Sequence, residues 1–335
     1  MPPRTVSPFR ILTWHVHGSY LDSLVRTGHE FYVPVRDDGG ERHGGIGHWG
    51  WPTDRVHEVP EDEVRDLDVD LVLFQHARNW REDGPRVLSD RQLRGPRIYI
   101  EHDPPWADPT EARHPVDDPD VLLVHVTAFN ALMWDNGRTP TRVIEHGVAD
   151  PGLRWNGRLG RGLVVINDLG TRGRRLGRDI FDRAREHLPI DLVGMRTAEY
   201  GGLGEVLRKD LPAFSARYRF FFHPVRYTSF GMAICEAMMI GMPVVALATT
   251  EMPTVLEDGR SGIIHTDPDY LIDGAGQLIH DHALAARLGE AGRRVALERF
   301  SIDRFAADWS RTFAEVIGRS SVTLPDGGRR IPVTA

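Results

Sequence analysis

The sequence contains very little cysteine: Cys235 is the only one in 335 residues. This excludes a framework of intrachain disulfides and a cysteine-rich zinc site, and it is typical of a protein from a reducing compartment. The chain also has no excess of basic residues, because 41 Lys and Arg stand against 48 Asp and Glu, giving a formal net charge of −7. Nucleic-acid binding generally requires a basic stripe that neutralises phosphates, so no nucleic acid is expected as a partner.

Long apolar segments are missing as well. The first ten residues, MPPRTVSPFR, contain no apolar core of the signal-peptide type. The most apolar window, 233–247, includes Glu236, Gly241 and Pro243 and is too short to span a bilayer. Without a basic amphipathic helix, membrane contact is not expected. We therefore expect a cytoplasmic protein, and its oligomeric state stays open.

Short apolar runs alternate with amphipathic segments through the first half of the chain. The runs at 9–16, 68–75, 97–102, 121–127 and 141–148 are continuous, which predicts strands buried on both faces, as in a parallel sheet flanked by helices. A stretch rich in Gly, Pro and Asn follows at 149–162, and we place a domain linker there.

The same alternation restarts after the linker. Strands are predicted at 163–168, 190–194, 218–224, 242–247 and 262–266, and helices at 174–188, 230–240, 269–279, 282–298 and 301–318. Two β/α series predict an α/β protein with two Rossmann-like, doubly wound parallel-sheet domains facing a cleft. The expected limits are 1–150 and 151–300, with the helix 301–318 packing back on the first domain and a loosely ordered tail at 319–335.

A motif in the second half carries a family resemblance. Residues 228–236 read TSFGMAICE, and residues 237–245 read AMMIGMPVV. Together they resemble the donor domain of retaining glycosyltransferases of the GT-B type, especially the GT4 family. The family pattern is Glu-x-Phe-Gly-x-x-x-x-Glu followed by Ala-x-x-x-Gly-x-Pro-Val-Val. The likeness is strong over about 50 residues, 218–265, and consistent in element order over most of the chain.

The motif also predicts a binding site on physical grounds. Ser229, Phe230, Gly231 and Met232 open a helix directly after a strand, where free backbone N–H groups and the helix dipole suit a diphosphate. Gly231 would allow close approach of the backbone. A lone helix glutamate is usually solvated, but the resemblance implies that Glu236 accepts hydrogen bonds from the ribose of the nucleotide.

One position departs from the family pattern. Thr228 stands where the first Glu, which commonly contacts hydroxyls of the donor sugar, is usual. Threonine can donate and accept hydrogen bonds, but it has no charge and less reach. Either sugar recognition differs here, or another residue supplies the contact.

Phosphate binding also needs cations. The resemblance places an Arg and a Lys in and after the first strand of the donor domain, where this chain has Asn167 and Arg172. Because the alignment is ambiguous by two residues, Arg172 and Arg175 are both candidates for stabilising the leaving diphosphate. A solvated basic helix start is the alternative for either of them.

The first half offers two candidates near the reacting centre. Gly18 follows the first strand in a loop that faces the donor phosphates in the family, and His102 follows the strand 97–102 at the place of a family histidine. His102 would polarise or hydrogen-bond the sugar or acceptor, with Asp103 orienting it, and a packing role is the alternative. We interpret Asp68-Val69-Asp70 as a solvated turn and predict no metal ion.

These features favour a metal-independent, retaining glycosyltransferase that uses an NDP-sugar donor and a small-molecule, glycan or other acceptor, with no cofactor. An NDP-sugar epimerase of the same fold is one alternative. A non-catalytic nucleotide-sugar-binding subunit is another alternative, because Thr228 replaces the glutamate that commonly contacts the donor sugar. No Gly-x-Gly-x-x-Gly follows either first strand, which argues against a nicotinamide dehydrogenase.

Overall fold

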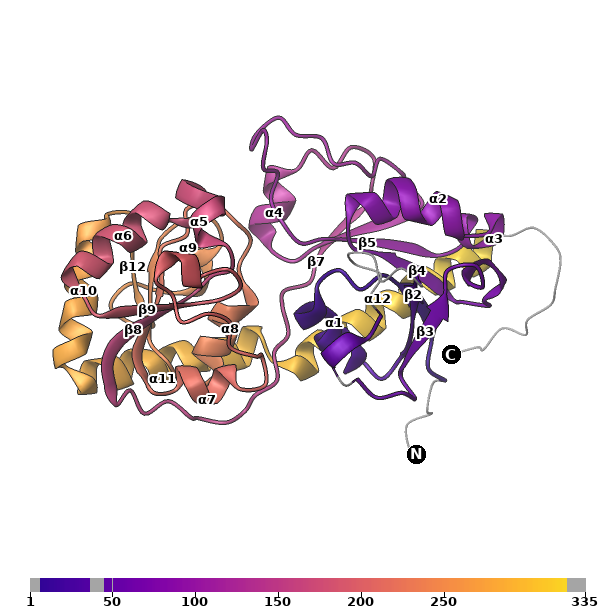
Figure 1. Cartoon of the computed structure of the whole chain (residues 1–335). Helices are drawn as coiled ribbons and strands as arrows, with labels where there is room; N and C mark the ends of the chain where they lie inside the picture. The colour runs from indigo at the N-terminus through magenta and orange to yellow at the C-terminus, as the bar shows by residue number, and fades with distance from the viewer. Residues whose placement is uncertain (1–6, 37–44, 50, 324–335) are drawn as a thin grey trace.

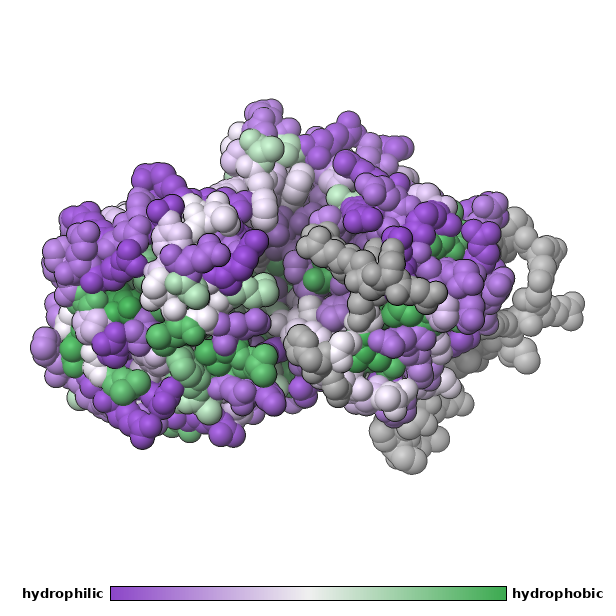
Figure 2. Space-filling model, in the orientation of Figure 1, coloured by the Kyte–Doolittle hydropathy of each residue, from purple (hydrophilic) through white to green (hydrophobic). Residues whose placement is uncertain are grey.

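Two parallel β-sheets, each in its own lobe, organise the chain (Figure 1). The computed structural model describes residues 7–36, 45–49 and 51–323, and its elements are labelled as in Figure 1. The surface is hollowed where the two lobes meet (Figure 2). The predicted fold class, α/β with two doubly wound parallel sheets, is confirmed.

The first sheet has seven parallel strands in the order β3-β2-β1-β4-β5-β6-β7. The chain winds outward from β1 to one side and then from β4 to the other, which is the doubly wound arrangement. The strands are β1 (Arg10–Thr13), β2 (Glu30–Val35), β3 (Val56–Pro60), β4 (Leu71–Phe74), β5 (Arg97–Glu101), β6 (Val121–His125) and β7 (Thr141–Val143).

The sequence pattern does not predict β2 and β3. Each contains a proline, Pro34 or Pro60. Buried side chains are interrupted by partly exposed ones in β2, and by partly and fully exposed ones in β3. Neither therefore forms the uninterrupted apolar run that marks the more central strands. The helices of this lobe are α1 (Gly18–Val25), α2 (Gly84–Val87), α3 (Asp90–Arg94) and α4 (Ala128–Met133).

The second sheet has five parallel strands in the order β12-β11-β10-β8-β9. They are β8 (Leu159–Val165), β9 (Ile190–Val193), β10 (Tyr218–His223), β11 (Val244–Leu247) and β12 (Ile263–His265). Strand β8 begins inside the stretch predicted as a linker, 149–162. Gly160 and Gly162, which indicated a turn in the sequence, are strand residues in the structure. A Cβ at Gly162 would lie 2.5 Å from the Phe220 ring, so that glycine makes room for β10.

Helices surround this sheet: α5 (Leu169–Arg172), α6 (Arg178–His187), α7 (Leu211–Ser215), α8 (Met232–Met239), α9 (Met252–Val255), α10 (Pro268–His280) and α11 (His282–Arg299). Consecutive side chains of β10 enter opposite layers of the core. Phe221 packs in one apolar cluster, and Phe220 and Phe222 pack in the other. Burying each ring stabilises the fold by about 1.5–3 kcal/mol.

The last helix, α12 (Ile302–Thr323), returns to the first lobe (Figure 1). Its residues Phe305, Trp309 and Phe313 are fully buried in a cluster with Tyr20 and Leu24 of α1. The Trp309 indole also donates a hydrogen bond to the Tyr20 hydroxyl at 3.2 Å. The helix continues to Thr323, beyond the predicted end at 318, and the rest of the predicted tail lies outside the described residues.

The chain crosses between the lobes twice, after β7 and after α11, and the two crossings lie side by side. The N–H of Val148 donates to the carbonyl of Phe300 at 2.9 Å, and Val148 forms a parallel bridge with Ser301. Gly147 fits this crossing closely, because a Cβ there would lie 2.2 Å from Cβ of Phe305. The crossings thus form one two-stranded connection between the lobes.

Candidate active site

The N-terminus of α8 faces open space at the carboxyl end of β10. Gly231 is the residue before the helix, and it has no side chain that could cap the first turn. A Cβ at Gly231 would meet nothing within 4 Å, so the space in front of the helix is open at this point. The N–H of Ile234 donates to the Gly231 carbonyl at 3.1 Å. The N–H groups of Met232 and Ala233, together with the helix dipole, therefore favour an anion here.

Two cations follow β8 in a segment that contacts the residues leading into α8, because the Arg175 carbonyl accepts from the N–H of Tyr227 at 3.2 Å. Arg172 is the last residue of α5, and Arg175 lies in a short 3₁₀ turn before α6, rather than in the helix predicted from the sequence. The half-exposed ring of Trp106, from the first lobe, covers both guanidinium groups, with centroid distances of 3.7 Å for Arg175 and 5.8 Å for Arg172. Burial and the neighbouring Arg175 lower the pKa of Arg172, although it stays charged.

Arg174 takes a different direction from its neighbour Arg175. Its guanidinium pairs with Asp179 of α6 at 2.6 Å, and its side chain is largely exposed. Arg226 pairs with the same carboxylate at 2.5 Å. Among Arg172, Arg174 and Arg175, only Arg172 and Arg175 contact the other lobe through Trp106. Arg174 therefore serves as a control position for tests of Arg175.

The loop after β5 is held against the second lobe beside these arginines. The Tyr227 hydroxyl donates to the carbonyl of Pro105 at 2.9 Å, and the Tyr227 ring meets Phe129 edge-on. Asp103 lies in this loop near the Thr228 hydroxyl, which lowers the pKa of its carboxyl. A carboxylate of the first lobe is thus placed at the position where the motif lacks its usual Glu.

The surroundings of Asp103 act on its charge in both directions. Burial, followed by the charge of Glu101, raises the pKa of the Asp103 carboxyl to about 6. Arg172, Arg175 and the Thr228 hydroxyl oppose this rise. The carboxyl can therefore change its protonation state close to neutral pH.

His102 lies at the end of β5, and Gln75 rather than Asp103 orients it. The Gln75 amide nitrogen donates to Thr13 Oγ1 at 3.0 Å and to the Trp14 carbonyl at 3.1 Å. Its Oε1 lies 3.3 Å from Nε2 of His102 and acts as the acceptor, which places the His102 proton on Nε2. The ring also packs against His17 at 4.1 Å and meets the Tyr20 ring edge-on at 4.8 Å.

Burial lowers the pKa of His102 well below its ordinary value, and the nearby His17 and His146 lower it further. The imidazole is therefore neutral at pH 7. With Nε2–H engaged by Gln75, Nδ1 can accept a hydrogen bond. The predicted role of Asp103 as the residue that orients His102 is replaced by Gln75.

Glu236 projects from α8 toward the first lobe and pairs with a residue that the motif does not contain. Arg208 Nε lies 3.2 Å from Glu236 Oε1. Burial raises the pKa of the Glu236 carboxyl, and Arg208 opposes that rise. The buried carboxylate thus has a partner, as a charged group with little exposure requires.

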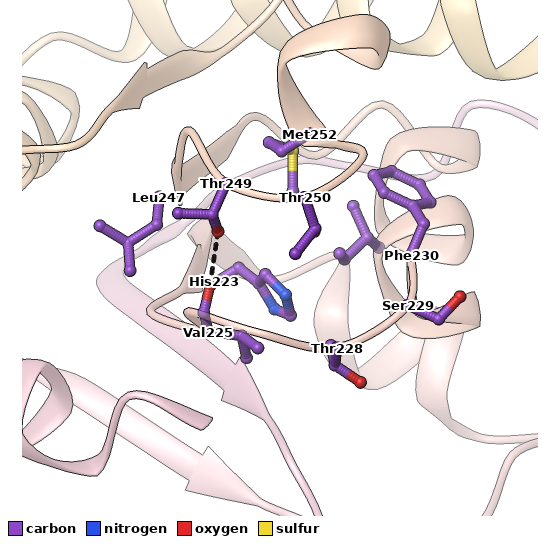
Figure 3. A pocket seen from close by; sticks show the side chains of 10 residues that line it. His223, Val225, Thr228, Ser229, Phe230, Leu247, Thr249, Thr250 and Met252 are labelled. Carbon is purple, nitrogen blue, oxygen red and sulfur yellow. Dashed lines mark hydrogen bonds between the residues drawn. The ribbon is translucent and has the colours of Figure 1, made fainter. Parts of the chain in front are cut away.

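A small pocket lies between the ends of β10 and β11 and the start of α8 (Figure 3). The ring of His223 lies among Val225, Thr228 and Thr250, and the Thr249 hydroxyl donates to the Val225 carbonyl at 3.1 Å (Figure 3). Burial lowers the pKa of His223 to about 4. The pocket therefore lies next to Thr228 and the start of α8, and the His223 imidazole that lines it is neutral.

Other predicted donor residues have partners within the protein. Ser229 Oγ accepts from Asn130 of α4 at 3.2 Å, and the Phe230 carbonyl is 2.7 Å from His146 Nε2. The Phe230 ring is buried against Phe300, so its side chain belongs to the core. Asn167 Oδ1 accepts from the N–H of Met195 at 2.9 Å. Their contact with a donor stays a prediction.

Comparisons with known proteins address the identity of this arrangement. A family model described as Glycosyl transferases group 1 matches residues 194–281. A GDP-mannose-dependent alpha-(1-6)-phosphatidylinositol monomannoside mannosyltransferase of Mycolicibacterium smegmatis is 33% identical over 284 residues, covering 71% of this chain and 74% of that protein. The chain belongs to the group 1 glycosyltransferases.

Other relatives match over a smaller share of their length. A D-inositol 3-phosphate glycosyltransferase of Streptomyces bingchenggensis is 36% identical, and the match covers 61% of this chain and 39% of that protein. One of Xylanimonas cellulosilytica is 37% identical, and the match covers 81% of this chain and 54% of that protein. The chain thus spans about half or less of these two relatives.

Solved structures support the predicted GT-B fold of the chain. A sucrose-phosphate synthase from Thermosynechococcus elongatus superposes with a TM-score of 0.70 at 16% identity, covering 93% of this chain and all of that one. Anabaena HepE, solved in complex with UDP-glucose, gives a TM-score of 0.65 at 16% identity, covering 92% and 100% of the two chains. At this identity the likeness concerns the fold alone.

The predicted loop position of Gly18 needs a correction. Gly18 is the first residue of α1 rather than part of a loop. A Cβ at Gly18 would lie 2.3 Å from the Trp49 ring, so the glycine makes room for that indole. The Trp49 ring occupies the space next to Gly18. Contact of Gly18 with the donor phosphates stays a prediction.

Both aspartates of the Asp-x-Asp pair have partners within the protein. Asp70 accepts a hydrogen bond from the N–H of Arg10 at 2.9 Å, and Asp68 pairs with Arg91. Within the described residues, no group of three His, Cys, Asp or Glu side chains is placed to hold a metal ion. None of the helices in the described part of the chain has the length and apolar character needed to cross a membrane.

Proposed function

We propose that this protein is a GT4-type enzyme that transfers a sugar from an NDP-sugar to an acceptor hydroxyl, with retention at the anomeric carbon and without a metal ion. One observation carries the proposal: Arg172, Arg175 and the open N-terminus of α8 lie on one lobe, and Asp103, next to His102, faces them from the other. A bound donor would be held between these groups.

The diphosphate would lie in front of α8. The N–H groups of Met232 and its neighbours would bind its oxygens, and Arg172 and Arg175 would supply positive charge. Guanidinium groups suit this role because their planar fork can bind two phosphate oxygens at once. Glu236 would accept hydrogen bonds from the ribose hydroxyls.

The reaction would proceed through charge that develops on the leaving diphosphate. The bond between the anomeric carbon and the phosphate oxygen breaks, and a bond to the acceptor oxygen forms on the same face of the sugar. The acceptor proton passes to the departing phosphate oxygen. Arg172, Arg175 and the α8 amides would stabilise that oxygen's negative charge.

His102 would act on the sugar or the acceptor from the first lobe. Because its imidazole is neutral and Nδ1 is the free acceptor, it would accept a hydrogen bond from a hydroxyl rather than donate a proton. Asp103 would supply a carboxylate next to Thr228, where the sugar hydroxyls of the donor are expected.

The first experiment is a thermal-shift screen with UDP, GDP, ADP and dTDP, because a ligand that binds the native state raises its apparent stability. UDP and GDP have priority, since HepE was solved with UDP and one relative is named GDP-mannose-dependent. Slow release of free sugar from the matching NDP-sugar, unchanged by EDTA, would support the proposal. Binding without release would indicate a non-catalytic subunit, and inversion at C2 of the sugar would indicate an epimerase.

A further inference from the structure

Arg208 joins both lobes at the carboxylate that we assign to the ribose. Its Nε donates to Glu236 on α8 at 3.2 Å, and one of its terminal nitrogens donates to the Ser19 carbonyl of α1 at 2.9 Å. The same nitrogen lies 3.3 Å from the carboxylate of Asp22. All three side chains are three-quarters or more buried, with exposures of 25% for Arg208, 22% for Asp22 and 19% for Glu236.

The contacts of Arg208 engage one oxygen of Glu236, which is Oε1. A carboxylate can accept several hydrogen bonds on its two oxygens, so Oε2 remains available for a diol. Holding Oε1 from outside α8 also restricts the rotation of the carboxylate. Arg208 therefore sets both the direction and the charge of the group to which a ribose would bind.

The charge of Glu236 depends on few neighbours. Burial raises the pKa of its carboxyl, Arg208 from the segment before α7 lowers it, and Asp22 from α1 raises it. Asp22 also pairs with Arg26 at 3.5 Å and accepts from the Trp51 indole at 3.1 Å. On the α11 side of α8, Arg293 pairs with Asp150 at 2.8 Å.

We propose that Arg208 is a positioning residue for donor binding, which keeps the Glu236 carboxylate ionised and aimed at the ribose while it joins α8 to α1. The proposal rests on the ribose role of Glu236 in the proposed function. Because a protonated Glu236 would lose one acceptor, loss of Arg208 makes donor binding sensitive to pH. An ion pair that only stabilised the fold would weaken binding equally at every pH.

The test is calorimetric titration of the full chain with UDP-glucose and with GDP-mannose between pH 5.5 and 8.5. Each phosphate of such a donor has one ester and one anhydride bond and keeps only one strongly acidic oxygen, so the ligand phosphates do not titrate in this range. In Arg208→Met, the ratio of affinities at pH 8.5 and pH 5.5 should exceed that of the wild type by roughly threefold or more, the effect of one partly buried ion pair. Arg208→Lys should restore most of the wild-type profile.

Two further variants separate the possible outcomes. Glu236→Gln should bind more weakly with a flat profile, and Asp22→Asn should move the loss of affinity to lower pH, opposite to Arg208→Met. A parallel drop at all pH values, or none, in Arg208→Met overturns the role of Arg208. Unchanged binding by Glu236→Gln would instead remove the ribose role, and thermal unfolding of each variant identifies any that fail to fold.

Discussion

The Gln75 side chain lies 3.3 Å from His102, with its amide oxygen toward Nε2 of the imidazole. Gln75 is 3% exposed, and its amide nitrogen is engaged by Thr13 and Trp14. A flipped amide would lose both of these hydrogen bonds. The orientation of a buried glutamine in the first sheet thus determines which ring nitrogen of His102 faces the candidate site.

The first prediction concerns this pair. Gln75→Leu should lower kcat by about 10- to 100-fold, because the His102 tautomer is no longer fixed, with little change in donor KM. Steady-state kinetics with the donor from the thermal-shift screen would measure this. His102→Ala is the reference variant. Full kcat in Gln75→Leu alongside a strong loss in His102→Ala would contradict the assignment.

The second prediction uses two adjacent arginines. Arg175→Ala should weaken binding of the nucleoside diphosphate by about 10- to 100-fold, since hydrogen bonds to charged groups contribute about 1.5–3 kcal/mol. Arg174→Ala removes the same side chain one position away, where it pairs with Asp179. Its affinity should stay within about twofold of the wild type. Equal losses in calorimetric titrations of the two variants would point to a general charge effect.

The third prediction compares two glycines. Gly231→Ala should leave stability within about 0.5 kcal/mol of the wild type, because the site is open and its φ of −79° suits any residue. It should still weaken diphosphate binding, because the new methyl group enters the space in front of α8.

Gly147→Ala should behave in the opposite way. Its Cβ would overlap that of Phe305, and relieving that contact requires a shift of α12 costing about 1–3 kcal/mol. Urea unfolding and nucleotide titration of both variants measure the two effects. A destabilised Gly231→Ala with normal binding would contradict the anion site at α8.

The fourth prediction is loss of stability in mild acid. Burial lowers the pKa of His125, His146 and His223 to about 4 each, against about 6.5 in an unfolded chain. A depressed pKa contributes stability that is complete above the unfolded value and is lost as the pH falls toward the folded value. The free energy of unfolding should therefore fall between pH 6.5 and 4, by at most about 1.4 kcal/mol per group and pH unit.

Asp103 acts in the opposite direction. Its pKa is raised to about 6, so its cost to the folded state is relieved as the pH falls below that value. The three histidines outweigh it. Urea unfolding at pH 8, 6.5 and 5 measures the net slope, and His125→Gln should make it shallower. A flat or rising stability across this range would contradict the assignment of neutral buried imidazoles.

Much of the architecture was predictable because parallel strands buried on both faces leave a continuous apolar pattern. Strand β10, with Phe220, Phe221 and Phe222, is such a case. Strand β2 is not, since its partly exposed positions and Pro34 break the pattern. The helix start after Phe230 was predictable too, because a local motif specifies it.

The partners of the site residues were not predictable, because they come from distant parts of the sequence. Arg208 lies 28 residues before Glu236 in a loop with no motif, and it contacts α1 as well. Gln75 lies 27 residues before His102 and reads only as the end of a strand. For Asp103, sequence adjacency to His102 suggested the wrong contact, since the turn after β5 directs it toward Thr228. Folding, not spacing, brings these groups together.

The return of α12 to the first lobe has a consequence during synthesis on the ribosome. Tyr20 and Leu24 cannot acquire their covering residues Phe305 and Trp309 until the entire second lobe has been translated. At about 5–20 residues per second, this delay is on the order of ten seconds or more. During that interval the apolar face of α1 that includes Tyr20 and Leu24 is exposed on the nascent chain, where a chaperone can bind it.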